Sequence, residues 1–102
     1  MQLSKVLSAL AEPTRLSAMR LLWDSDEHCV CELMGQLGAT QSRMSRHMAV
    51  LKAAGLVLDR RDAQWVRYRR NPGLTPAVAK AVSAIVRAAD ALEKPISRRS
   101  AA

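Results

Sequence analysis

The sequence predicts a mostly helical domain that carries one small β-hairpin. Apolar side chains recur at the i, i+3, i+4, i+7 spacing of a helical face through most of the chain, and the spacing changes to every second residue only after Gly55. The 102 residues are enough for one hydrophobic core and too few for two domains. We expect this domain to span residues 1–94 and residues 95–102 to form a flexible basic tail.

Three short helices are expected in the first third of the chain. The second begins at Pro13, a residue suited to the first helical turn. The third runs from Val30 to Leu37 and ends at Gly38, because glycine readily adopts the conformation that follows a helix. The apolar face of the first helix is formed by Leu3, Val6, Leu7 and Leu10.

The middle of the chain predicts a helix-turn-helix followed by a hairpin. A fourth helix over 41–54 follows the third after the short turn 38–40. Segments 56–61 and 65–70 are rich in Val, Leu, Trp and Tyr and predict two paired strands, joined by a turn at 62–64 that lacks the usual glycine. A hairpin in this position is a wing, so the predicted fold is a mostly α winged helix-turn-helix.

A fifth and longer helix is expected at the end of the chain. Thr75 is a suitable N-cap, Pro76 fits the first turn, and Pro95 ends the helix. Its apolar stripe consists of Val78, Val82, Ile85, Val86, Ala89 and Leu92. This stripe and the face of the first helix offer more apolar surface than a small protomer can cover, so we expect a homodimer built on these two helices.

Positive charge is concentrated in one block of the chain. The sequence has 16 Lys and Arg residues against nine Asp and Glu, and residues 41–70 contain eight of the basic residues but only two of the acidic ones. Residues 1–40, in contrast, are slightly acidic. A basic surface confined to one helix and one hairpin indicates nucleic-acid binding.

The fourth helix has the composition of a recognition helix. A helix that enters a major groove about 12 Å wide needs small residues and a few long donors, and arginine can bind guanine or phosphate through two hydrogen bonds. Any one arginine alone fits a solvated face, whereas the group as a whole favours DNA. For His47, capping, phosphate contact and packing on the third helix all remain open. The expected DNA contacts are Gln41, Ser42, Arg43, Ser45, Arg46, His47, Arg60, Arg61, Gln64 and Arg67.

The only two cysteines, Cys29 and Cys31, lie where the third helix should begin. A helix N-terminus favours the thiolate form that binds ligands. Residues i and i+2 of an intact helix do not face each other, so we expect an ion held by both sulfurs to distort the first turn of this helix. The alternative is that both cysteines are small buried hydrophobes.

Several motifs resemble the ArsR/SmtB family of winged-helix repressors. They are AEPTRL at 11–16, CVCEL at 29–33, QSRMSRHM at 41–48 and WVRYR at 65–69, within a resemblance that covers about residues 3–92. The CVCEL segment resembles the branch that senses arsenic and heavy metals. The resemblance implies a homodimer that binds a palindromic double-stranded operator and is released by thiophilic ligands.

The resemblance also defines the expected ligands. Soft thiolates favour trivalent arsenic, antimonite and related ions, so the inducer is expected to bind Cys29 and Cys31, and no cofactor is expected for DNA binding itself. Arsenic sensors of this kind often have a third cysteine where this chain has Met34, which we assign to the core. Two sulfurs match a methylarsenical, or arsenite with an outside third ligand. His28 could be a ligand, but we expect it to be solvent-exposed.

Other functions are less well supported by the sequence. The last helix has acidic residues but no His, so we expect no zinc site there. An enzyme is disfavoured because the chain has two His, no Gly-rich phosphate loop and no paired carboxylates in a pattern that suits a cleft. A regulator that senses oxidant or persulfide remains an alternative, although a disulfide across one residue is strained, and so does a DNA-binding protein without inducer. With no signal peptide and no apolar run of about 20 residues, we expect a cytoplasmic protein with reduced thiols and no membrane partner.

Overall fold

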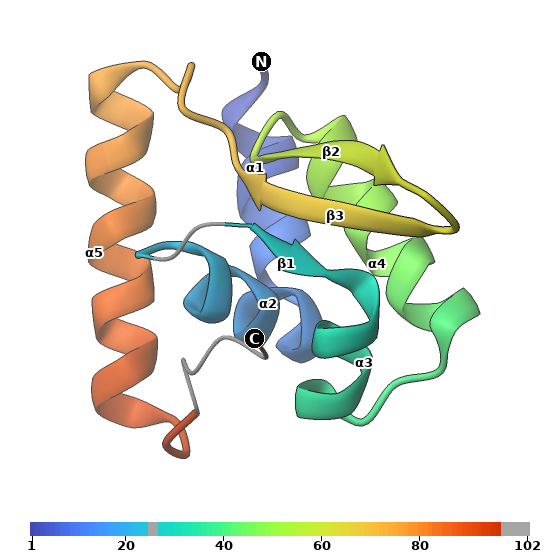
Figure 1. The fold of residues 1–102 in the computed structure, drawn as a ribbon. Helices are drawn as coiled ribbons and strands as arrows, with labels where there is room; N and C mark the ends of the chain where they lie inside the picture. The colour runs from blue at the N-terminus through green and yellow to red at the C-terminus, as the bar shows by residue number, and fades with distance from the viewer. Residues whose placement is uncertain (25–26, 97–102) are drawn as a thin grey trace.

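The computed structural model describes residues 1–24 and 27–96, in the order α1–α2–β1–α3–α4–β2–β3–α5 (Figure 1). The predicted mostly helical winged helix-turn-helix is confirmed, while most of the predicted tail lies outside the described residues. The helices are α1 (Leu3–Leu10), α2 (Pro13–Leu22), α3 (Val30–Leu37), α4 (Gln41–Ala53) and α5 (Pro76–Leu92). The strands are β1 (His28–Cys29), β2 (Val57–Asp62) and β3 (Trp65–Arg70).

Side chains at the helix starts define where each helix begins. Glu12, Thr40 and Thr75 are the N-caps of α2, α4 and α5, and each side chain accepts a hydrogen bond from a backbone N–H in the first turn. Gly38 adopts a positive φ of 69° at the end of α3, a conformation that costs glycine little. The turn that follows brings α4 across α3, as the helix-turn-helix requires.

The sheet contains one strand more than the sequence predicts. Residues of β1 pair with β3, which pairs in turn with β2, and both pairings are antiparallel. A strand of two residues shows no periodicity, so β1 could not be found from the sequence. The hairpin turn is also one residue shorter than expected, because Asp62 pairs with Trp65, and Ala63 adopts a φ of 55° where glycine is usual.

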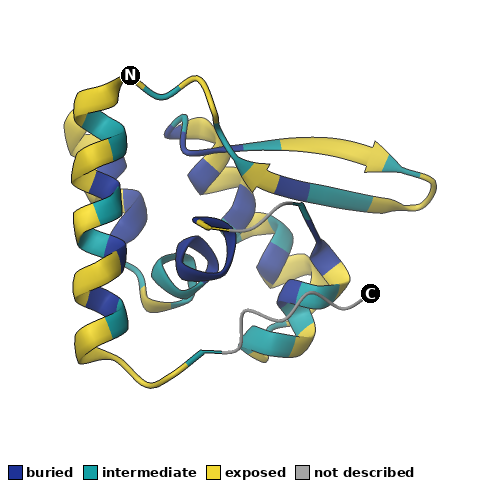
Figure 2. Cartoon of the chain, turned by 60° about the vertical axis from the view of Figure 1, so that its left-hand side comes forward, coloured by how far each residue is buried: buried dark blue, intermediate teal, exposed yellow. Residues whose placement is uncertain are grey.

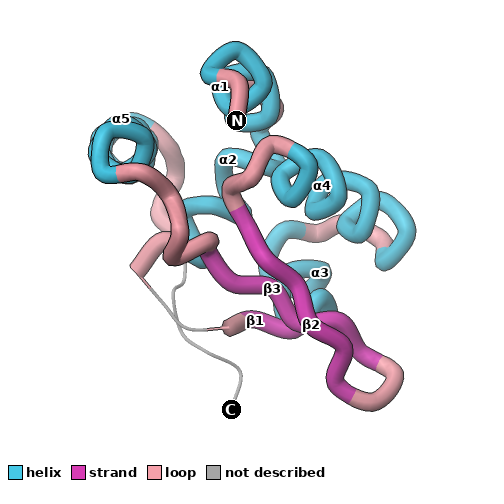
Figure 3. Tube along the Cα trace, turned by 90° about the horizontal axis from the view of Figure 1, so that it is seen from above, coloured by secondary structure: helices cyan, strands magenta, loops and turns pink. Residues whose placement is uncertain are grey.

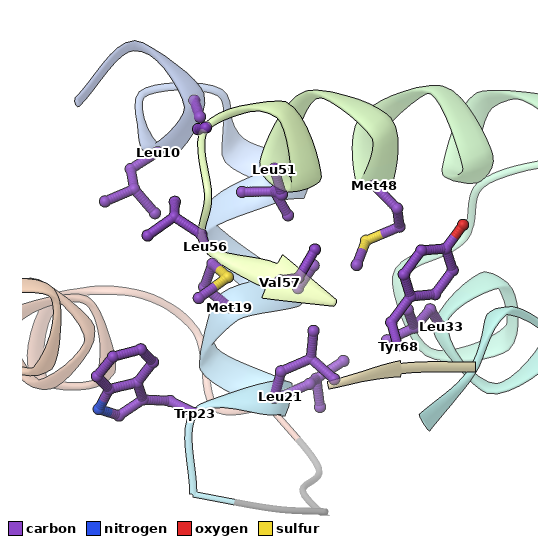
Figure 4. Close-up of a cluster of buried hydrophobic side chains, with 14 of the residues drawn as sticks. Leu10, Met19, Leu21, Trp23, Leu33, Met48, Leu51, Leu56, Val57 and Tyr68 are labelled. Atoms are coloured by element: carbon purple, nitrogen blue, oxygen red, sulfur yellow. The ribbon is translucent and has the colours of Figure 1, made fainter. Parts of the chain in front are cut away.

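Helix α2 forms the centre of the core. Its residues Met19, Leu21 and Leu22 are fully buried and meet side chains from α3, α4 and the sheet (Figure 4). Arg20 is buried as well and forms an ion pair with Asp90 of α5 over 2.8 Å. Helix α5 therefore packs on α2, and Figure 2 shows buried and exposed residues alternating along it.

The structure corrects part of the predicted dimer surface. Five of the predicted interface residues are buried inside the protomer and expose almost no surface to a partner: Val6, Leu10, Val82, Val86 and Ala89. Periodicity marks an apolar face but cannot distinguish packing on α2 from packing on a second chain. Leu3, Leu7 and Leu92 are 60%, 50% and 84% exposed, and Val78 and Ile85 are half-buried, so these five remain for the proposed interface.

Helix α5 and the hairpin tip lie at opposite sides of the molecule (Figures 1 and 3). A partner bound at α5 would therefore leave the wing and α4 accessible. None of the described helices combines the length and the apolar character that crossing a membrane requires.

Candidate DNA-binding surface and thiol pair

The predicted groove face of α4 is exposed. Gln41, Ser42, Arg43 and Arg46 are exposed and Ser45 is half-buried, whereas the opposite side of the helix is buried through Met44, Met48 and Leu51. Neither Arg43 nor Arg46 has an ion pair among the described residues. The small residues and free guanidinium groups thus lie on one accessible face, which is suited to entering a major groove.

The arginines of the wing differ in whether they form an ion pair with a carboxylate of the chain. Arg60 donates to both carboxylate oxygens of Glu27 over 2.6 and 2.7 Å, and these hydrogen bonds hold the pKa of Glu27 below its ordinary value. Arg67 donates to Asp62 over 2.7 Å. Arg61 is exposed and has no ion pair within residues 1–24 and 27–96, and Gln64 is exposed at the turn. Arg61 is therefore the predicted wing contact whose charge is most available to DNA.

His47 of α4 packs on the start of α2. Its Nδ1 lies 3.3 Å from Nη1 of Arg15 and 3.6 Å from Oε2 of Glu12. Burial acts to raise the pKa of Glu12, but the backbone N–H groups of Arg15 and Thr14 and the nearby His47 and Arg15 lower it overall. His47 thus contacts α2, and Arg15 joins the basic surface from outside the recognition helix.

The two cysteine sulfurs meet at the start of α3. Cys29 is the N-cap, with an extended backbone (φ −65°, ψ 147°), and Cys31 lies in the first turn. The structure joins them as a disulfide with their Cα atoms 5.2 Å apart. Cys29 is only 3% exposed while Cys31 is exposed, so a ligand would reach the pair from the side of Cys31.

The close approach of the two sulfurs bears on two predictions made from the sequence. The sequence predicts that a shared ion must distort the first turn of the helix, but the extended N-cap already lets the sulfurs converge while α3 stays intact. The sequence also predicts reduced thiols, and the structure places the two sulfurs close enough to form a disulfide. Both the chelation of one ion and the oxidation to a disulfide require the two sulfurs to lie close together.

His28 is buried rather than solvent-exposed, which corrects the prediction. Its side chain is 1% exposed, and Nδ1 lies 2.9 Å from Oε2 of Glu32. The other oxygen of Glu32 accepts a hydrogen bond from the backbone N–H of Cys29, closing a capping box around the thiol pair. Strand β1 turns the imidazole inward, opposite Tyr68, and the sequence could not show this because it gave no sign of the strand.

Few side chains near the thiol pair could serve as additional ligands. Met34 packs partly buried against the core, as the sequence predicts. Across the residues that the structure describes, no three His, Cys, Asp or Glu side chains converge as a metal site would require. The chain therefore offers two sulfurs, which fits a ligand that needs two protein bonds or brings its own third donor.

Comparisons with known proteins agree with this architecture. Residues 12–58 match the family model described as "Bacterial regulatory protein, arsR family". The arsenic resistance transcriptional regulator ArsR2 of Pseudomonas putida is 48% identical over 69 residues, which are 68% of this chain and 60% of that protein. The arsenical resistance operon repressor of Escherichia coli is 40% identical over 78 residues, 76% of this chain and 67% of that protein.

A solved structure supports the same fold. It is the solution structure of a homodimeric winged helix-turn-helix DNA-binding domain from Mycobacterium bovis, described as a possible ArsR-family transcriptional regulator. It is 30% identical to this chain, with a TM-score of 0.69, and the match covers 88% of this chain and 81% of that one.

Proposed function

The chain belongs to the ArsR family of bacterial regulatory proteins, and from this premise we propose that it is an arsenic(III)-responsive transcriptional repressor. It binds a palindromic double-stranded operator as a homodimer. It leaves the operator when Cys29 and Cys31 bind a trivalent arsenical, antimonite or another thiophilic ion. The observation that carries this proposal is the convergence of two sulfurs within a winged helix-turn-helix.

The chemistry of the reduced pair suits trivalent arsenic. When arsenous acid reacts with the two thiols, two As–S bonds form, and two hydroxyl groups leave with the thiol protons as two molecules of water. The third arsenic bond remains with hydroxide or passes to a small outside thiol. A methylarsenical(III) already fills that third position with carbon, so two sulfurs complete its coordination.

The contacts of the thiol pair connect the ligand site to both parts of the proposed DNA-binding surface. Cys29 belongs to β1, which pairs with β3 of the wing, and Cys31 belongs to α3, which packs on α4. A ligand that bridges the two sulfurs fixes the relative position of these two elements. The wing and α4 must fit one DNA surface together, so binding weakens when the relative position that the ligand imposes differs from the one that DNA requires.

The test is a release titration on operator-bound protein. Cys29→Ser and Cys31→Ser should each bind the operator like wild type, because neither residue lies on the groove face and serine is a good N-cap at position 29. Neither variant should be released by arsenite, because a single thiolate cannot chelate. Release of either variant at the wild-type arsenite concentration would refute the chelate.

The close approach of the two sulfurs also suits a second candidate, a regulator that senses oxidants through the same pair. Peroxide would take two electrons and two protons from the thiols, leaving one disulfide and two molecules of water. The operator complex treated with mild peroxide, without arsenic, distinguishes the two functions. Release accompanied by the loss of two mass units favours oxidant sensing, and retention on DNA favours the arsenic sensor.

A further inference from the structure

We propose that Arg15 of α2 completes a phosphate-binding pocket beside the recognition helix, and that this pocket receives a backbone phosphate of the operator. This inference rests on the proposed DNA-binding function and adds a contact from outside the helix-turn-helix. The pocket has a volume of about 270 Å³ and is lined by Arg15, Arg43, Arg46, His47 and Val50.

Arg15 is held in place before any ligand arrives. Its Nε donates to the carbonyl of Ala9 over 2.7 Å, and its Nη2 donates to the carbonyl of Ser8 over 3.5 Å. Its Nη1 lies 3.3 Å from Nδ1 of His47, which gives the guanidinium a third neighbour on the side of α4. None of these three partners is an anion, so the charge of Arg15 is positioned without a direct ion pair.

The charge balance of the pocket favours an anion. Arg43 and Arg46 also have no ion pair among the described residues, which places three guanidinium groups around one cavity. The carboxylate of Glu12 stands beside the pocket, where it accepts a hydrogen bond from the backbone N–H of Arg15 over 3.0 Å and lies 3.6 Å from Nδ1 of His47. Three fixed positive charges against one negative charge match a phosphate oxyanion, which arginine binds through two parallel hydrogen bonds.

The position of the pocket indicates the source of the phosphate. Arg43 and Arg46 belong to the groove face of α4. His47 and Val50 follow Arg43 at the i+4 and i+7 positions and extend the pocket from that face to the flank of the helix. A helix about 10–12 Å across fills a major groove about 12 Å wide, so its flanks face the phosphate backbone. Helix α4 lies beside α2 (Figure 3), and Arg15 lines the pocket from the first turn of α2.

The experiment measures operator affinity against salt concentration for wild type, Arg15→Gln and the control Arg87→Gln. Arg87 is an exposed arginine on α5, so this control removes the same charge far from the pocket. Arg15→Gln should lower the magnitude of the salt slope by about 1 in each subunit and weaken operator and unrelated DNA alike, whereas the control should not. An unchanged slope in folded Arg15→Gln overturns the inference. Failure of wild type to bind any operator would instead refute the proposed function.

A second variant separates the pocket from a structural role of Arg15, which also supports the end of α1. Glu12→Gln removes the carboxylate at the pocket and should tighten DNA binding, even if losing a charged N-cap lowers the melting temperature. If Arg15 and Glu12 only stabilise the fold, both Arg15→Gln and Glu12→Gln should bind DNA as wild type does or more weakly. That result would overturn the inference.

The third experiment is a titration of the protein with inorganic phosphate at constant ionic strength. Binding is followed by NMR through the signals of the His47 imidazole. A phosphate response that requires Arg15, together with the lower salt slope, supports the inference. A phosphate response with an unchanged DNA salt slope would assign the pocket to a free anion and overturn it.

Discussion

Cys29 lies directly opposite Arg67 in the antiparallel pairing of β1 with β3. Two residues earlier, Glu27 binds Arg60 of β2, so the segment that carries the thiol is attached to both strands of the wing. Two residues later, Cys31 belongs to the helix that supports α4. The thiol pair therefore stands between the two parts of the proposed DNA surface, and the following predictions test each part.

The protein should be a homodimer in solution through Leu3, Leu7 and Leu92, with Val78 and Ile85 beside them. Leu7→Glu should shift it toward monomer in sedimentation velocity, because a buried unpaired carboxylate opposes association. Trp65→Glu, at an exposed apolar residue of the wing, is the control and should remain dimeric. Two recognition helices about 34–36 Å apart would match one turn of DNA. A wild-type chain that stays monomeric at micromolar concentration contradicts this prediction.

Arg46 and Arg61 should contribute to DNA binding in different ways. Arg46→Ala should weaken operator binding by about 1–3 kcal/mol and reduce discrimination between sequences, if its guanidinium reads a base. Arg61→Ala should weaken all DNA similarly and lower the salt slope by about 1 in each subunit. Fluorescence anisotropy with operator and scrambled DNA measures both effects. Unchanged operator affinity in Arg46→Ala would mean that α4 is not the recognition helix.

Glu27→Gln should raise DNA affinity and increase the salt slope, because it frees Arg60 to contact a phosphate. The pKa of Glu27 is lowered in the folded protein from its ordinary 4.5, so the ion pair stabilises the fold above about that pH. This contribution is lost as pH falls through the lowered pKa. The difference in melting temperature between wild type and Glu27→Gln should therefore disappear only on acidification below 4.5. A difference that is the same at neutral and strongly acidic pH would show that the pair does not stabilise the wing.

Met34 should determine the preference among arsenicals. With two sulfurs available, methylarsenical(III) should release wild type from DNA at least as readily as arsenite. Met34→Cys should shift the preference toward arsenite, because position 34 lies one turn beyond Cys31 on the same side of α3. Met34→Leu controls for the change in packing. The comparison is a release titration of each protein with both ligands and no added thiol. A strong wild-type preference for arsenite that Met34→Cys leaves unaltered would mean that another group supplies the third bond.

Local sequence patterns were enough to predict the five helices, the hairpin and the position of the thiol pair at a helix start. These features depend on local periodicity, capping residues and turn residues, all of which are visible within about ten neighbouring positions. The family motifs are local as well, so they could be recognised without coordinates.

Which elements pack against one another became clear only from the folded chain. Strand β1 exists because β3 offers it an edge, and that pairing buries His28, which the sequence placed in solvent. Val82 and Val86 pack on the protomer's own core, although their periodicity fits a dimer equally well. Arg15 reaches His47 across 32 positions of sequence. Contacts between distant segments depend on how the chain packs as a whole, and no local pattern specifies them.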